Sequence, residues 1–219
     1  ILVLATLESV SEKYRHIPYM GFKKANFIRK IINENNYSDL LELGFFHGKS
    51  SVLLASILEE RKKGHLTTID LHSAKERKPN IETLLNTEGL AHRVTPLYCT
   101  RSYNWELMQQ IQSDPTPRYD LCYLDGGHTL DHTGLGFFLV DKLLRVGGTI
   151  VFDDLDWTLS SNPVYREKLE EGVDIYAEYS ESEKNTPAVK MVFEHLVGSS
   201  GYQCKTVEEF GWGIAQKVR

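Results

Sequence analysis

Runs of apolar residues alternate with segments of helical periodicity along the chain. In residues 22–35, Phe22, Ala25 and Ile28 lie three or four positions apart, which predicts an amphipathic helix. The further predicted helices are 51–63, 81–88, 103–112, 131–145, 163–171 and 187–197. Short apolar runs bounded by glycine, proline or charged residues predict strands at 39–43, 65–70, 94–98, 119–124, 149–152, 202–207 and 213–218.

This alternation of strands and helices predicts an α/β fold, a three-layer, doubly wound parallel sheet with helices on both faces. A short turn around Phe210-Gly211 joins the last two strands, so we expect these two to pair antiparallel. We interpret residues 1–219 as one domain that begins with a helical segment, 1–37. The polar and irregular stretch 155–186 is expected to form a lid or substrate segment.

The composition is that of a globular protein, with 41% hydrophobic and 25% charged residues. No apolar run is long enough to span a membrane, and the opening ILVLA lacks the basic flank of a signal peptide. A net charge of -5 disfavours nucleic acid and anionic membranes as partners. Cys99, Cys122 and Cys204 are too dispersed for a disulfide framework or a CxxC zinc site, which fits a cytoplasmic protein.

Ligands of open α/β sheets bind at the carboxyl ends of the strands. After the first predicted strand, Gly44 and Gly48 in ELGFFHGKSS allow a ligand to approach the backbone beside the start of a helix. Asp70 ends the second strand about 20 residues later, where an acidic side chain can accept hydrogen bonds from the ribose of a nucleoside cofactor. A tight strand-to-helix turn and a helix-capping aspartate are the alternatives.

Acidic residues follow the fourth and fifth predicted strands: Asp125 in DGGH, and Asp153 with Asp154 in FDDLDW. We expect these strands to be neighbours, so the three carboxylates should lie on one rim. Carboxylates that share a pocket repel one another unless a positive charge neutralises them, and a hard divalent cation does this well. In the alternative interpretation, Asp154 caps the next segment and Asp153 bonds to backbone.

His128 lies on the same predicted rim. Its imidazole suits a general base, although a histidine held in place by neighbouring loops fits equally. His128 and His132 are four residues apart, but HTLDH is not HExxH and no cysteine is near, which disfavours zinc. Ser102, after the third strand, either bonds an adenine edge or caps the next helix.

Taken together, LLELGFFHGKSS, TTID, YDLCYLDGGH and LLRVGGTIVFDDLDW resemble the class I S-adenosylmethionine-dependent methyltransferases. The resemblance extends from about residue 20 to residue 219 and is greatest to the branch with sugar and small-molecule O-methyltransferases. It implies a Rossmann-like sheet of seven strands whose last strand is antiparallel. Gly127 departs from the family, because an acidic residue is common between the glycine and the histidine of this motif.

The resemblance also implies site residues. Those expected around the cofactor, S-adenosylmethionine, are Glu42, Gly44, Gly48 and Ser50 at the methionine end, Asp70 at the ribose, Leu71 and Ser102 at the adenine, and Asp125. Asp125, Asp153 and Asp154 match the positions that hold Mg²⁺ in metal-dependent members. His128 matches the histidine of the DGxH motif.

We therefore predict a methyltransferase that acts on a small hydroxylated molecule, with His128 and Asp125 as catalytic residues and Mg²⁺ as a candidate cofactor. Two alternatives stay open. A nicotinamide-dependent oxidoreductase is disfavoured because GxGxxG and a Tyr-xxx-Lys pair are missing, and a non-catalytic nucleoside-binding domain is the other. The sequence does not specify the substrate or the acceptor atom, and a homodimer is the expected assembly only by analogy with other small enzymes.

Overall fold

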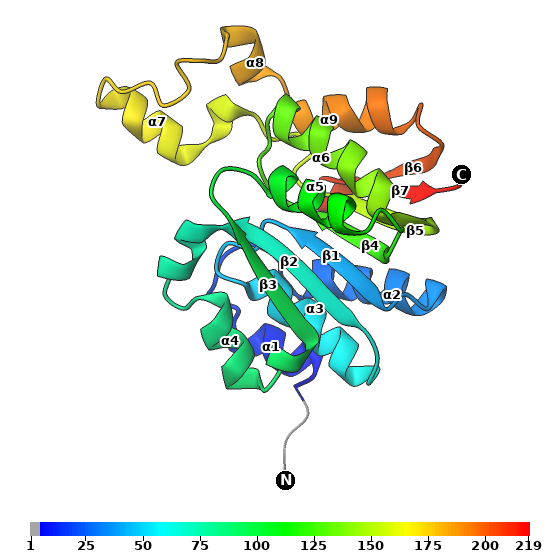
Figure 1. The fold of residues 1–219 in the computed structure, drawn as a ribbon. Helices are drawn as coiled ribbons and strands as arrows, with labels where there is room; N and C mark the ends of the chain where they lie inside the picture. The colour runs from blue at the N-terminus through cyan, green and yellow to red at the C-terminus, as the bar shows by residue number, and fades with distance from the viewer. Residues whose placement is uncertain (1–4) are drawn as a thin grey trace.

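The central feature of the fold, seen in a computed structural model that describes residues 5–219, is a sheet of seven strands (Figure 1). The strands are β1 (Asp39–Leu43), β2 (His65–Leu71), β3 (Val94–Cys99), β4 (Tyr119–Leu124), β5 (Leu144–Phe152), β6 (Tyr202–Val207) and β7 (Trp212–Lys217). Of the opening ILVLA run, only Ala5 belongs to the described residues.

The strand order is β3-β2-β1-β4-β5-β7-β6. Strands β1 to β5 pair in parallel with one another, and β7 is antiparallel to both β5 and β6. The predicted doubly wound sheet with an antiparallel last strand is thus confirmed. The order reverses between β1 and β4, so the carboxyl ends of these two strands flank the position where such sheets bind ligands.

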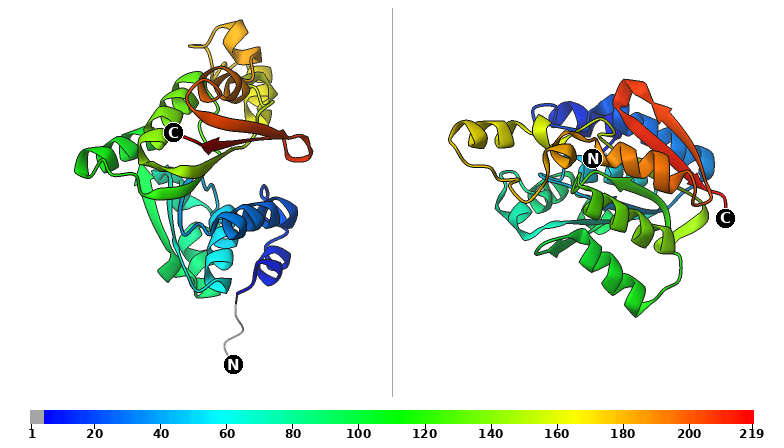
Figure 2. Two further views of the ribbon diagram at one scale, coloured as in Figure 1. Left: turned by 90° about the vertical axis from the view of Figure 1, so that its right-hand side faces the viewer. Right: turned by 90° about the horizontal axis from the view of Figure 1, so that it is seen from above.

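Helices cover both faces of the sheet (Figure 2). They are α1 (Leu7–Lys13), α2 (Phe22–Asn35), α3 (Lys49–Glu60), α4 (Ile81–Glu88), α5 (Tyr103–Ser113), α6 (Leu130–Leu143), α7 (Pro163–Glu170), α8 (Glu181–Asn185) and α9 (Ala188–Val192). Helices α1 to α4 pack together on one face, and α5, α6 and α9 on the other. Successive side chains of a strand point to opposite faces, so Leu40 belongs to the first hydrophobic core and Leu41 to the second.

Several predicted boundaries are wrong. The helix predicted at 51–63 is Lys49–Glu60, and the one predicted at 187–197 is α-helical only over Ala188–Val192. The pair Gly147-Gly148 does not end a helix over 131–145, because α6 ends at Leu143 and both glycines lie within β5. A Cβ atom on Gly148 would lie 2.9 Å from the carbonyl oxygen of Asp120, so glycine here permits close approach of two strands.

The stretch 155–186 contains more regular structure than expected. It holds a 3₁₀ turn at Leu159–Ser161 and the short helices α7 and α8, and it projects beyond the sheet at the upper left of Figure 1. The rings of Tyr165 and Tyr176 pack at 4.9 Å, and Lys184 pairs with Asp174 at 2.8 Å. These contacts hold the segment together, and its role as a lid stays a prediction.

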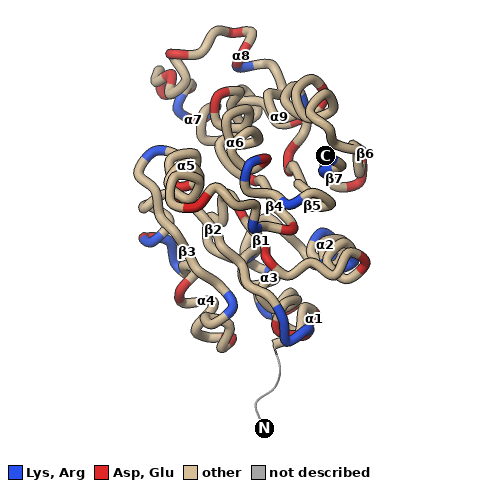
Figure 3. The backbone as a smooth tube through the Cα atoms, turned by 45° about the vertical axis from the view of Figure 1, so that its right-hand side comes forward, with Lys and Arg blue, Asp and Glu red and all other residues tan. Residues whose placement is uncertain are grey.

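Charged residues of both signs are distributed over the described helices (Figure 3). None of these helices is both long and apolar enough to cross a bilayer. Cys99 and Cys122 are buried thiols and Cys204 is an exposed one, and none of the three is in a disulfide.

Candidate functional site

The carboxyl ends of β1, β2, β4 and β5 surround a cavity of about 340 Å³. Its lining includes Gly44, Asp70, Asp125, His128 and Asp154, so residues from four separate loops share one hollow. The N-terminal segment and the stretch after β5 supply the remaining walls, mainly Pro18, Tyr19, Met20, Trp157, Asn162 and Pro163. Of the residues predicted to share the rim after β4 and β5, Asp125, His128 and Asp154 line this cavity and Asp153 does not.

The loop after β1 depends on Gly44. This residue has φ +89°, and a Cβ atom there would lie 2.4 Å from the carbonyl oxygen of Asp125. Only glycine combines this backbone conformation with such close contact to the neighbouring loop. Gly44 therefore allows the β1 and β4 loops to meet at the cavity floor.

Asp70 shapes the same loop from the adjacent strand. Its Oδ2 atom accepts hydrogen bonds from the backbone N–H groups of Phe45 and Phe46 at 2.8 and 2.6 Å. Its Oδ1 atom accepts one from Leu71 N at 2.6 Å, which leaves capacity at Oδ1 for a ligand hydroxyl. Asp70 thus stabilises the loop after β1, in addition to the ribose contact predicted for it.

The start of helix α3 opens into the cavity. Gly48 is its N-cap residue and supplies no side-chain cap, while Ser50 lines the cavity within the first turn. The first amides of a helix carry partial positive charge and suit an anionic group such as a carboxylate. Buried Lys49 donates to the carbonyl oxygen of Ile17 at 2.6 Å and so holds the N-terminal wall in place.

Four predicted cofactor residues are not among those that line this cavity: Glu42, Gly48, Leu71 and Ser102. Glu42 is fully buried beneath the loop, where Oε2 accepts hydrogen bonds from the hydroxyls of Ser51 and Thr68. Burial raises its pKa to about 7. Ser102 caps helix α5 by accepting from Asn104 N at 3.2 Å, and Leu71, the last residue of β2, is exposed. Their contact with a cofactor stays a prediction.

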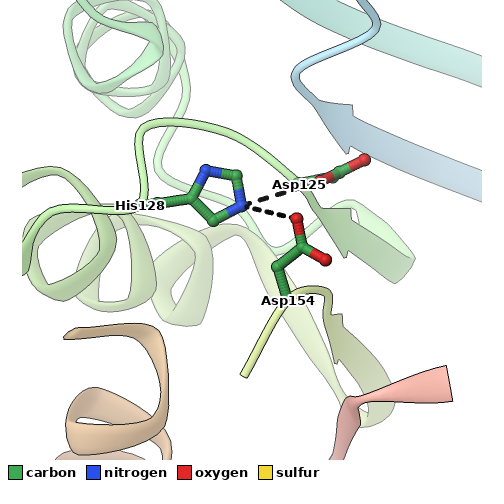
Figure 4. Close-up of side chains that lie close together, drawn as sticks. All are labelled: Asp125, His128 and Asp154. Carbon is green, nitrogen blue, oxygen red and sulfur yellow. Dashed lines mark ion pairs between the residues drawn. The ribbon is translucent and has the colours of Figure 1, made fainter. Parts of the chain in front are cut away.

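Asp125, His128 and Asp154 form a compact cluster at the cavity wall (Figure 4). The Nε2 atom of His128 lies 3.3 Å from Oδ2 of Asp154 and 3.8 Å from Oδ1 of Asp125. Asp154 has φ +57°, an unusual conformation for a residue with a side chain, and such conformations concentrate at functional sites. One potential ligand atom from each residue lies within 4.8 Å of the others.

The two carboxyl groups of this cluster differ electrostatically. The pKa of Asp125 is raised well above its usual value by desolvation, and by repulsion from Asp153 and Asp154. The pKa of Asp154 is lowered, chiefly by the His128 imidazole, whose Nε2 atom lies 3.3 Å from Oδ2. The Trp157 ring packs 4.8 Å from the imidazole, so His128 is held between an aromatic surface and two acids.

Of the predicted metal ligands Asp125, Asp153 and Asp154, the first and last share a group of potential ligand atoms with His128, and Asp153 is not in this group. Asp153 is only 5% exposed and binds Lys24, with Nζ at 3.0 and 3.2 Å from its two oxygens. The third residue with a potential ligand atom close to those of Asp125 and Asp154 is His128. The residues that could hold a divalent cation are thus Asp125, His128 and Asp154, a mixed nitrogen and oxygen set.

A second cavity, of about 500 Å³, also has His128 in its wall. It lies under the 155–186 segment and the start of α6, with Arg101, Leu130, Tyr179 and Met191 among its lining residues. The imidazole of His128 is therefore shared by two hollows.

Sequence reasoning missed Lys24 and the N-terminal wall. Lys24 lies in an amphipathic helix where a lysine normally faces solvent, and nothing local to the sequence indicates its distant partner. Tyr19 and Met20 precede that helix and carry no motif. The aromatic content around Trp157 was the one available signal for a wall of the pocket.

A model of the methyltransferase-domain family matches residues 41–155, slightly more than half of the chain. This protein belongs to that family, and the class predicted from its motifs is confirmed. No curated protein matches the chain.

Several solved structures share the fold. An O-methyltransferase from Bacillus cereus in complex with SAH has 20% identity and a TM-score of 0.64, covering 96% of this chain and 89% of that chain. The O-methyltransferase TomG from Streptomyces achromogenes, in complex with SAM and involved in tomaymycin synthesis, has 19% identity, a TM-score of 0.64 and coverages of 97% and 89%. A candidate caffeoyl-CoA O-methyltransferase from Staphylococcus aureus has 19% identity, a TM-score of 0.66 and coverages of 95% and 90%.

Proposed function

We propose that this protein transfers the methyl group of S-adenosylmethionine to an oxygen of a small hydroxylated molecule, with His128 as general base. The observation that carries the proposal is the position of His128 in the walls of both cavities. Membership of the methyltransferase-domain family and the SAM and SAH complexes of similarly folded proteins support the choice of cofactor.

The first cavity suits the cofactor. The methionine carboxylate of the cofactor would lie at the N-terminus of α3, near Gly48 and Ser50. A ribose hydroxyl would donate a hydrogen bond to Oδ1 of Asp70. The buried Oε1 atom of Glu42 has no hydrogen-bond partner among the described residues. The ammonium group of the methionine, directly or through water, would satisfy this atom.

The second cavity suits the acceptor. Leu130, Leu159 and Met191 give it apolar walls, while Arg101 and Tyr179 supply polar groups. Most of its lining residues are polar or charged, Asp131, Glu178 and Glu183 among them. A small molecule with several hydroxyl groups and an apolar part fits this lining, because the polar side chains would bind the hydroxyl groups and fix its orientation.

When bound, the cofactor supplies an electrophilic sulfonium methyl group. The protein then has to place the acceptor oxygen in line with that methyl, which is a positioning effect. His128 takes the proton from the acceptor hydroxyl, and the carboxylates of Asp125 and Asp154 stabilise the resulting imidazolium. Trp157 shields one side of the imidazole from water.

A divalent cation at Asp125, His128 and Asp154 is a second candidate for activating the acceptor, favoured by their convergence within 4.8 Å. The nitrogen ligand favours a transition-metal ion over the Mg²⁺ predicted from the resemblance. In that case His128 binds the cation and does not serve as the base. Turnover that survives EDTA would exclude the cation, and turnover restored only by added metal would exclude the base.

The test compares wild type with His128→Asn. We expect both proteins to bind S-adenosylhomocysteine with the same Kd, while the variant loses about 10²–10⁴-fold in kcat on an accepted phenol or sugar. Full kcat in the variant would refute His128 as base. Thermal stabilisation by NAD(H) and none by S-adenosylhomocysteine would overturn the proposed activity altogether.

A further inference from the structure

We propose that Lys24 is a resident cation of the active-site rim, which neutralises Asp153 and keeps this carboxylate out of metal coordination. A side chain from α2 then supplies positive charge that the sequence led us to expect from a metal ion. Lys24 is a positioning residue in this proposal, because it acts on the site through Asp153.

The hydrogen bonds of Asp153 account for all of its acceptor capacity. Oδ1 accepts from Lys24 Nζ at 3.0 Å and from the backbone N–H of Asp154 at 2.8 Å. Oδ2 accepts from Lys24 Nζ at 3.2 Å and from the hydroxyl of Tyr123. A carboxylate has about four lone-pair positions, and all four are engaged. A metal ion would have to displace one of these donors.

The environment of Lys24 is that of a fixed group. Its side chain is 26% exposed, and its Nζ atom lies 5.2 Å from the ring centroid of fully buried Trp212. The adjacent Lys23 differs sharply, since its side chain is 82% exposed and forms a surface ion pair with Glu209 at 3.3 Å. An ion pair with one partner almost fully buried is screened much less by solvent than a surface pair.

A continuous set of contacts connects Lys24 to the His128 cluster. The Tyr123 hydroxyl, which donates to Asp153, also lies 3.2 Å from Oδ2 of Asp125. Asp125 in turn lies beside His128. The ammonium of Lys24 therefore offsets part of the carboxylate repulsion at this rim and leaves a divalent cation only Asp125, His128 and Asp154 as ligands.

The experiment measures Mn²⁺ affinity by isothermal titration of the full chain, with no cofactor or acceptor present. Lys24→Met removes the resident charge and frees Asp153, so we expect Mn²⁺ to bind at least tenfold more tightly than to wild type. Lys23→Met is the matched control and should leave the affinity within twofold. Adding Asp153→Asn to Lys24→Met should abolish the gain, whereas Asp153→Asn alone should change the affinity less than threefold.

Equal Mn²⁺ affinity in wild type and Lys24→Met would overturn the proposal, as would a tenfold loss in Asp153→Asn alone. Cooperative thermal melting establishes that each variant is folded, and Lys24→Gln replaces Lys24→Met in the same comparison if the latter does not fold. The binding of S-adenosylhomocysteine to wild type reports on the proposed function separately, so the two ideas can fail independently.

Discussion

Replacing Glu42 by glutamine perturbs a carboxyl group that is completely buried under the β1 loop. Desolvation is the main cause that raises the pKa of Glu42 from 4.5 to about 7, and hydrogen bonds from serine and threonine hydroxyls only partly oppose it. The folded state therefore retains a proton on this group over a range where the unfolded chain has released it. Stability falls as pH rises from about 4.5 through 7, because the folded state must then ionise a buried carboxyl.

The magnitude follows from the difference between the two pKa values. At about 1.4 kcal/mol for each pH unit, the ionised group costs about 3 kcal/mol above pH 7 and nothing below pH 4.5. Glutamine has nearly the same shape and cannot ionise, so Glu42→Gln should gain stability relative to wild type as pH rises. The constant cost of burying its amide is the same at every pH and cancels from the trend.

The assay is urea denaturation of both proteins without cofactor, at several pH values from 5 to 8.5. We expect the difference in unfolding free energy, variant minus wild type, to increase by about 3 kcal/mol over this range. Glu34→Gln, in an exposed position on α2, is the matched control. A difference for Glu42→Gln that stays constant with pH would refute the argument that this carboxyl is desolvated.

Three further predictions concern the same region. Asp70→Ala should weaken S-adenosylhomocysteine binding more than tenfold by calorimetry, because a lost hydrogen bond to a charged group is worth about 1.5–3 kcal/mol; an unchanged Kd would count against the ribose assignment. Gly44→Ala should lower the free energy of unfolding by about 1–3 kcal/mol or more, since its methyl group meets the Asp125 carbonyl in a left-handed conformation; wild-type stability in denaturant would contradict this. Tyr123→Phe should cost about 1–3 kcal/mol in the same measurement, because Asp153 loses a buried donor, and no loss would show that water replaces the hydroxyl.

Most elements of the fold follow from local patterns. Helix α2 and strands β1, β4 and β6 have the boundaries that periodicity predicts, because apolar spacing within one element is a property of consecutive residues. The parallel sheet also follows, since helices between strands require crossover connections. The structural role of Gly147-Gly148 cannot be predicted from local patterns, because a glycine pair can either end a helix or let two strands approach closely. Here the neighbouring strand, which passes close to Gly148, determines that role.

The sequence also determines in part which residues lie at the rim of the cavity. Gly44 and Asp125 each follow a strand and Asp70 lies at the end of one, and parallel strands bring their carboxyl ends to one edge. Motif and topology therefore place these residues in a common cavity before any side-chain contact is known. Within 155–186, the helix predicted at 163–171 is present as α7, whereas α8 was not predicted, because so short a helix depends on contacts such as that between Lys184 and Asp174.

The chemistry within the rim was decided by tertiary structure. Asp153 and Asp154 are adjacent and chemically identical, yet one binds Lys24, 129 positions away in sequence, and the other faces His128. Successive residues at a strand end point in different directions, and which of them meets a partner depends on how a distant helix packs. The sequence by itself determined which acids reach the rim, and only the packing of α2 against the sheet decided which acid is neutralised by a lysine and which remains available for chemistry.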